Sequence, residues 1–263
     1  MSEMKFKEFV EIVKRLRKEC PWDREQTNDS IKSATIEEAY EVVEAIENKN
    51  YEDLSKELGD LLLHVVFHTV IAEETNQFTL DDVIKSITEK LIRRHPHVFG
   101  ETQVKDSDEV KLNWENIKLL EGRSSVLEGV PEQLPALQRA HRLQEKAAKV
   151  GFDWEKKEDV WKKVLEEIEE MHEADVKHQN SKDSKQKLHE ELEDEIGDVF
   201  FALVNYARFL NVNPENALRK TNKKFINRFT YVEKKITESG RKMIDSNLTE
   251  MDKYWEESKT LVK

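Results

Sequence analysis

Four segments of this chain occur twice in the same order, and this internal repeat limits the fold more than any other feature of the sequence. A repeat of this length indicates two copies of one structural unit. The aligned pairs are TIEEAYEVVEAI (35–46) with VLEEIEEMHEAD (164–175), SKELGDLLLHVVF (55–67) with LEDEIGDVFFALV (192–204), TEKLIRRHPHVF (88–99) with NKKFINRFTYVE (222–233), and NWENIK (113–118) with YWEESK (254–259).

The boundary between the copies lies in EGRSSVLEGVPEQLP, residues 121–135. This stretch holds two of the seven glycines and two of the five prolines, and the helical periodicity lapses there. We therefore predict an N-terminal helical domain at residues 1–121, a linker at 122–135 and a C-terminal helical domain at 136–263.

The chain is poor in residues that end helices. Only 7 Gly and 5 Pro occur among 263 residues while 37% of the residues are charged, a composition that favours long helices over sheets. We predict an all-α fold with four or five helices in each half: a leading amphipathic helix, then helices that carry EExxE, ExGD, a Lys/Arg pair and a Trp.

Charge and apolar content restrict the partners and the compartment. A formal net charge of -12 repels phosphate backbones, so we expect no nucleic-acid partner. Cys20 is the only cysteine and the chain begins with an amphipathic helix pattern rather than a leader, which favours a reducing, cytoplasmic setting. The longest apolar stretch, residues 61–72, is shorter than the roughly 20 residues of a membrane span, so we expect no membrane contact.

Acidic residues recur at helical spacing in both halves. Acids three residues apart share one face of a helix, and here they border apolar stripes. In one interpretation they form a solvated face. In the other, carboxylates from two helices converge, and a cation must offset their repulsion and lost hydration. Oxygen-only ligands favour Mg²⁺ or Mn²⁺ over zinc. The acids are Glu38, Glu41, Glu57 and Asp60 in the first half, and Glu167, Glu170, Glu195 and Asp198 in the second.

Basic and aromatic positions also recur. A Lys and an Arg four residues apart could bind phosphate oxygens or form ordinary helix-surface ion pairs. A repeated Trp could stack on a nucleobase or fill a core. These residues are Lys90, Arg94 and Trp114 in the first half, and Lys224, Arg228 and Trp255 in the second.

Two further features carry weaker signals. Gly59 and Gly197 lie between paired acids inside helical patterns, where glycine costs about 1 kcal/mol relative to alanine. Close approach of another helix or a ligand would explain them, as would a simple packing contact. The HPH sequence at 95–97 resembles a metal motif, but its proline breaks helical spacing and the second half has Phe229 and Tyr231 instead, so we expect no metal there.

With these motifs, and with CPWD at 20–23, RRHPHVF at 93–99 and VGFDW at 150–154, the chain resembles the two-domain MazG nucleoside triphosphate pyrophosphohydrolases over nearly its whole length. The resemblance implies an all-α fold, a homodimer with sites in helical bundles, and Mg²⁺-dependent hydrolysis of NTPs or dNTPs to a monophosphate and pyrophosphate. By position, it implies that the second-half acids bind the metal and that Lys224, Arg228 and Trp255 contact the nucleotide. The equivalent first-half residues form a second such set.

The chemistry consistent with this resemblance is attack of an activated water on the α-phosphorus. We expect the second half to do most of it, because the long polar connection between Glu170 and Glu195 could form a lid, although a surface loop is the alternative. Two other functions stay open. A di-iron carboxylate bundle needs two Glu-x-x-His motifs, and only Glu169 with His172 has that spacing near the cluster. A nucleotide sensor or scaffold would bind without catalysis.

Overall fold

The computed structural model describes residues 2–107, 109–110, 113–114, 117, 121, 125–181 and 185–261. Within these ranges all regular secondary structure is helical, which confirms the predicted fold class. The chain divides into two compact units, residues 1–110 and 111–263, and each is described by itself.

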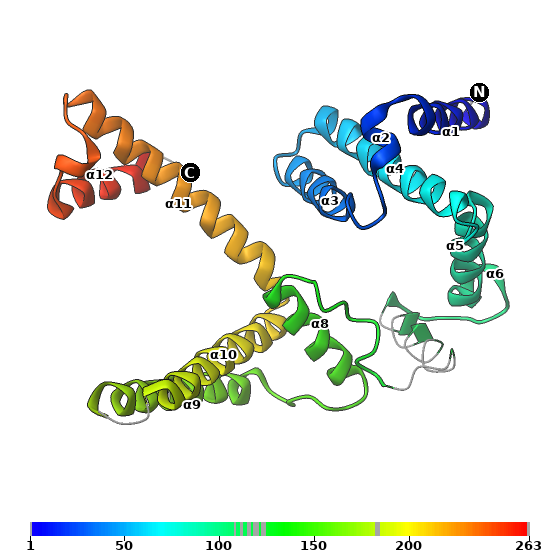
Figure 1. Cartoon of the computed structure of the whole chain (residues 1–263). Coiled ribbons are helices and arrows are strands. Elements are labelled where there is room, and N and C mark those ends of the chain that lie inside the picture. The colour runs from blue at the N-terminus through cyan, green and yellow to red at the C-terminus, as the bar shows by residue number, and fades with distance from the viewer. Residues whose placement is uncertain are drawn as a thin grey trace. The chain divides into compact units, whose positions relative to one another are not determined.

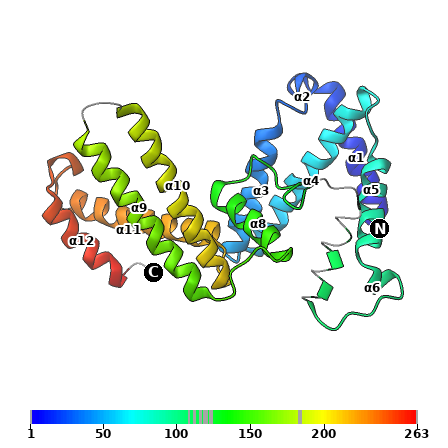
Figure 2. The same cartoon turned by 90° about the horizontal axis from the view of Figure 1, so that it is seen from below.

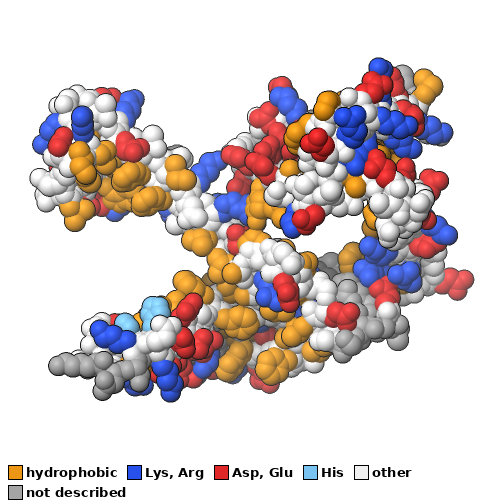
Figure 3. Space-filling view, in the orientation of Figure 1, with side chains coloured by type: hydrophobic (Ala, Val, Ile, Leu, Met, Phe, Trp, Pro, Cys, Tyr) orange, Lys and Arg blue, Asp and Glu red, His pale blue; other side chains and the backbone are white. Residues whose placement is uncertain are grey.

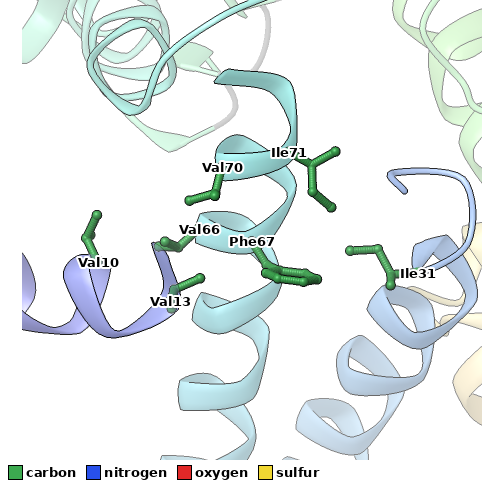
Figure 4. Packing of buried hydrophobic residues seen from close by; sticks show 7 residues of the cluster. All are labelled: Val10, Val13, Ile31, Val66, Phe67, Val70 and Ile71. Atoms are coloured by element: carbon green, nitrogen blue, oxygen red, sulfur yellow. The ribbon is translucent and has the colours of Figure 1, made fainter. Parts of the chain in front are cut away.

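The first unit is a set of helices around one central helix, α4 (Figure 1). Its core comes from α1, α4 and the residue before α3: Val66 and Val70 lie on the α1 side of α4, and Phe67 and Ile71 lie towards Ile31 (Figure 4). The helices are α1 (Ser2–Glu19), α2 (Pro21–Glu25), α3 (Lys32–Glu47), α4 (Tyr51–Glu74), α5 (Leu80–Arg94) and α6 (Pro96–Phe99).

Polar residues define where α4 and α5 begin. Asn50 caps α4 by accepting from the backbone N–H of Asp53, and Thr79 with Asp82 forms a capping box at α5. Arg17 is 9% exposed and forms a two-pronged ion pair with Glu74, both contacts at 2.8 Å, while it also donates to the carbonyl of Gln26 at 2.9 Å. This arginine therefore ties α1 to the end of α4 and to the segment after α2.

The second unit is built on a hairpin of two long helices, α9 and α10, which run side by side in both views (Figures 1 and 2). Trp161 packs against Tyr206 at a ring-centroid distance of 4.9 Å at one end, and His178 lies 5.7 Å from His189 at the other. The hairpin is thus antiparallel. The elements are α8 (Ala136–Lys149), α9 (Lys157–Asn180), α10 (Lys185–Phe209), α11 (Pro214–Glu238), η1 (Met243–Asp245) and α12 (Leu248–Leu261).

The last two helices of this unit lie apart from the hairpin. α11 starts at the end of α10 and extends away from it, and α12 packs against the distant part of α11 (Figure 1). Val232 and Ile236 of α11 and Ser258 of α12 are almost fully buried in this pair. The five helices expected in the second half are therefore present in the expected order, with a short 3₁₀ turn added.

The segment predicted as a linker is attached to α8 where it is described. Lys146 is only 3% exposed, and its ammonium donates to the carbonyls of Val126 at 2.9 Å and Glu128 at 3.0 Å. A buried ammonium needs such acceptors to offset its lost hydration. Residues 122–124 of this segment lie outside the described residues.

Candidate metal centres and nucleotide pocket

Three acids of the second half converge between α9 and α10. One carboxylate oxygen from each of Glu167, Glu195 and Asp198 lies within 4.8 Å of the others. Glu167 is 7% exposed, Glu195 is half-buried and Asp198 is exposed. The cluster forms because an antiparallel hairpin puts the ExGD turn of α10 opposite the EExxE turn of α9.

Glu170 and Lys163 complete the surroundings of this cluster. Loss of hydration and the charge of Glu167 raise the pKa of Glu170, although Lys163 partly opposes this. The Lys163 ammonium lies 2.8 Å from Glu167 and 2.6 Å from Glu166, which raises the pKa of the lysine. Sequence reasoning missed Lys163, although its position one turn before Glu167 was the available signal.

A pocket of about 740 Å³ opens beside the same cluster, between α8, α9, α10 and the VGFDW segment. We call it the α8–α10 pocket. Glu167 and Asp198 of the acidic cluster line this pocket together with Lys163, and Phe152 and Trp154 of VGFDW also line it. In the sequence, VGFDW was noted only as a motif shared with the family. In the structure, this segment lines the pocket that Glu167 and Asp198 also line.

The first half has a matching acidic cluster. Carboxylate oxygens of Glu38 and Glu41 on α3 and of Glu57 on α4 lie within 4.8 Å of one another. Loss of hydration followed by the charges of Glu41 and Asp60 raises the pKa of Glu38. The pKa of Glu57 is raised by the same causes, with a shared hydrogen bond to Glu41. Asp60 is not one of the three converging acids, but its charge contributes to the raised pKa of both glutamates.

Beside Glu38, the first half contains a polar network that the second half lacks. Thr35 Oγ1 lies 3.0 Å from His64 Nδ1 and 2.8 Å from His68 Nε2, and His64 Nε2 lies 3.9 Å from Glu38. The aligned residues of the second half are apolar or aromatic: Val164, Ala202 and Tyr206. The two clusters thus have similar acids and different surroundings.

The structure does not bring the predicted basic residues to the acids within a single chain. Lys90 and Arg94 lie on α5, which follows the C-terminal end of α4, whereas Glu57 and Asp60 lie near the other end of α4. In the second unit, Lys224 and Arg228 lie on α11, the helix that extends away from the α9–α10 hairpin (Figure 1). The Nε atom of Arg228 is buried and has no hydrogen-bond partner among the described residues.

Trp255 lies in an apolar group on α11 and α12. Its ring packs on Phe225 at a centroid distance of 5.3 Å, and Phe225 stacks on Phe229 at 5.8 Å. These rings line a cavity of about 250 Å³, and Figure 3 shows apolar side chains (orange) gathered over this hairpin at the upper left. Trp114 is half-buried. In the single chain neither tryptophan is part of an acidic cluster.

The donor set fits a hard divalent cation. Both clusters of converging ligands found among the described residues consist of carboxylates alone, the ligands that Mg²⁺ and Mn²⁺ prefer. Glu169 and His172, the candidates for a di-iron motif, are exposed on α9 outside the cluster. A side-chain Cβ added at Gly59 or Gly197 would meet nothing within 4 Å, so no other part of the described chain approaches either glycine closely.

The repeated helical unit with one carboxylate cluster per copy defines a tandem all-α protein. Comparison with known proteins identifies the family. The model of the MazG nucleotide pyrophosphohydrolase domain matches residues 26–99 and again residues 155–232. The chain belongs to the MazG family.

Full-length relatives agree with this assignment. The chain is 45% identical over 259 residues to the nucleoside triphosphate pyrophosphohydrolase/pyrophosphatase MazG of Thermotoga maritima, covering 97% of this chain and 95% of the relative. It is 43% identical to the nucleoside triphosphate pyrophosphohydrolase of Escherichia coli K12, covering 95% of each. It is also 47% identical to the uncharacterized protein YabN of Bacillus subtilis, covering 97% of this chain and 51% of that protein. Among the described residues, no helix is both long and apolar enough to cross a membrane.

Proposed function

We propose that this protein hydrolyses nucleoside triphosphates, NTPs or dNTPs, to a nucleoside monophosphate and pyrophosphate, with Mg²⁺ as the metal and Mn²⁺ as a substitute. The observation that carries the proposal is the convergence of Glu167, Glu195 and Asp198 beside a pocket large enough for a nucleotide. The names of the Thermotoga maritima and Escherichia coli relatives support the same reaction.

In this proposal the residues of the second half have different roles. Glu167, Glu195 and Asp198 hold the cation, with Glu170 as the fourth acid. When bound, Mg²⁺ lowers the pKa of a water and offsets the charge of the triphosphate. A carboxylate of the cluster accepts the proton of the water that attacks the α-phosphorus. Lys163, which contacts Glu167 at 2.8 Å, would pair with a phosphate oxygen of the substrate if Glu167 held the cation.

Lys224, Arg228 and Trp255 contact the nucleotide, in this proposal, from a second copy of the chain. Within one chain α11 extends away from the acids, while a guanidinium with an unpaired buried Nε is suited to bind an anion. A homodimer in which the α11–α12 hairpin of one subunit covers the α9–α10 hairpin of its partner would unite the two sets.

Exposed apolar side chains support dimerisation independently. Leu165 and Phe200 of the α9–α10 hairpin are 51% and 56% exposed, and Phe225 and Ile226 of α11 are 55% and 62% exposed. Both hairpins therefore present apolar side chains that a partner subunit could cover.

Product analysis tests the proposed reaction. The full chain is incubated with each of the four NTPs and four dNTPs plus Mg²⁺, and the products are separated as pyrophosphate and orthophosphate. We expect pyrophosphate with an equal amount of monophosphate, and no product when EDTA removes the cation. Release of orthophosphate would contradict attack at the α-phosphorus, and tight nucleotide binding without any product would favour a sensor or scaffold.

A further inference from the structure

The α8–α10 pocket has two exposed aromatic rings beside the acidic cluster. Phe152 is 83% exposed and Trp154 is 47% exposed, although both follow directly from a helix and line a cavity of about 740 Å³. Aromatic rings left open to solvent in a pocket are typical of sites that stack flat ligands.

This aromatic segment is held in place by the helices on both sides. The backbone N–H of Phe152 donates to the carbonyl of Ala147 at 3.1 Å, which closes the end of α8, and Gly151 supplies the positive φ of 87° that the turn requires. Asp153 forms a two-pronged ion pair with Arg208 of α10, one contact at 2.9 Å. The backbone of this segment is therefore anchored to α8 and α10, while its two aromatic side chains stay exposed.

The helices that line the pocket offer an unused acceptor and a donor. Gln144 is 8% exposed; its amide N–H₂ donates to the carbonyl of Phe201 at 2.8 Å, which fixes the amide orientation, and its buried Oε1 has no partner. Asn205 uses its Oδ1 to accept from Arg208 at 2.8 and 3.1 Å, so its N–H₂ group is what it can offer a ligand. A buried carbonyl without a donor costs free energy that a ligand N–H would recover.

We infer that this pocket binds the nucleobase of the substrate, with Phe152 and Trp154 stacked on one face of the base and Gln144 and Asn205 bonded to its edge. The inference rests on the proposed function. The Watson–Crick edge of every nucleobase presents both an N–H donor and an acceptor, which matches this pair of amides. The triphosphate then extends towards Glu167 and Asp198, which line the same pocket, and the other face of the base stays available to Trp255 of a partner subunit.

Binding measurements on the full chain test this inference without relying on turnover. Calorimetry in Mg²⁺ compares the α,β-methylene analogues of ATP, GTP, CTP and UTP, which resist cleavage between the α- and β-phosphorus, with inorganic tripolyphosphate. Phe152→Ala should weaken binding of the nucleotide analogues by between about fivefold and a hundredfold and leave tripolyphosphate binding unchanged. Trp22→Ala, which removes an exposed ring (64%) from the first unit, is the matched control and should change neither.

A second variant tests whether Gln144 recognises the edge of the base. Gln144→Met keeps the volume and removes the amide, so it should change the order of preference among the four analogues, whereas a merely structural effect would weaken all four and tripolyphosphate equally. The inference is overturned if Phe152→Ala and Trp154→Ala bind every analogue as the wild type does, or if Trp255→Ala alone removes base preference. A wild-type chain that binds the analogues but releases no pyrophosphate would overturn the proposed reaction and leave the pocket intact.

Discussion

Exchanging a single acid in each half tests which cluster performs the chemistry. Asp60→Asn and Asp198→Asn change the same repeated position, and each replaces a carboxylate with an amide of nearly equal volume. Both residues are exposed, so neither change should unfold its helix. We expect Asp198→Asn to abolish most turnover and Asp60→Asn to have a small effect, because the α8–α10 pocket adjoins the second cluster.

The size of the metal effect can be worked from the cluster. Asp198 is one of three converging carboxylates, so Asp198→Asn would remove one ligand and one negative charge from the proposed cation site. Even residues that only orient metal ligands cost about 10–100-fold when changed, so a direct ligand should cost at least that. Mg²⁺ at 100 times its dissociation constant stabilises a fold by about 2.7 kcal/mol. For a unit of about 150 residues this raises Tm by about 5–11 °C.

The assay follows both quantities in the full chain. Pyrophosphate release under saturating Mg²⁺ gives turnover, and melting curves with and without Mg²⁺ give the stabilisation. The Asp198→Asn variant should lose turnover and should lose the increase in the Tm of the second unit that Mg²⁺ causes. Its Tm without metal should stay at least as high as that of the wild type. If Asp60→Asn reduces turnover as much as Asp198→Asn, or more, the assignment of catalysis to the second half is wrong.

Three other predictions concern acidity, the first-unit core and the aromatic hairpin. The pKa values of Glu38 and Glu57 are raised, so their ionisation destabilises the first unit as pH rises above the ordinary carboxyl pKa of about 4.3. The increase in Tm that Mg²⁺ causes should therefore be larger at pH 7 than at pH 5. An increase that is the same at both pH values would contradict this. Arg17→Met should lower the unfolding free energy by about 2–3 kcal/mol, measured by urea denaturation, because Glu74 and a carbonyl lose their donor; Glu74→Gln, at a half-exposed position, should cost less. Trp255→Ala should weaken nucleotide binding by about 1–3 kcal/mol in calorimetry with little change in Mg²⁺ binding; loss of the cooperative melt instead would identify Trp255 as a core residue.

The acidic clusters could be predicted because their geometry is local. Residues three apart share a helix face, so each motif presents its acids together once its helix forms. The lid or surface loop expected between Glu170 and Glu195 was wrong over most of its length, because α9 continues to Asn180 and α10 begins at Lys185; this helical hairpin brings EExxE and ExGD together. The structure places Glu167 opposite Glu195 and Asp198 in this way. The order of helices in the second half was predictable for the same reason, since each helix carries its own periodicity.

The α8–α10 pocket could not be predicted in this way, because its walls come from segments far apart in the chain. Gln144 lies 57 residues before the carbonyl of Phe201 that orients it, and Asp153 lies 55 residues before Arg208. No spacing rule connects such positions. The short helices α2 and α6, which begin at Pro21 and Pro96, were also missed. Sequence reasoning treated Pro96 as a break in helical spacing, whereas a proline is well tolerated as the first residue of a helical turn.

The contrast between acids and bases supports the proposal that a partner subunit completes the site. The acids of each cluster lie at most 31 positions apart along the chain and converge inside one hairpin. Lys224 and Arg228, in contrast, lie on a helix that extends away from that hairpin. Loss of hydration and, after it, the charge of Glu167 raise the pKa of Glu170 even though Lys163 opposes the shift, and this cost falls when a cation or a guanidinium arrives. Cation binding and subunit association should therefore reinforce each other: Mg²⁺ should shift the monomer–dimer equilibrium measured by sedimentation towards the dimer, and Arg228→Gln should reduce that shift. An equilibrium insensitive to Mg²⁺ would mean that the α11 residues of a partner do not reach the acids.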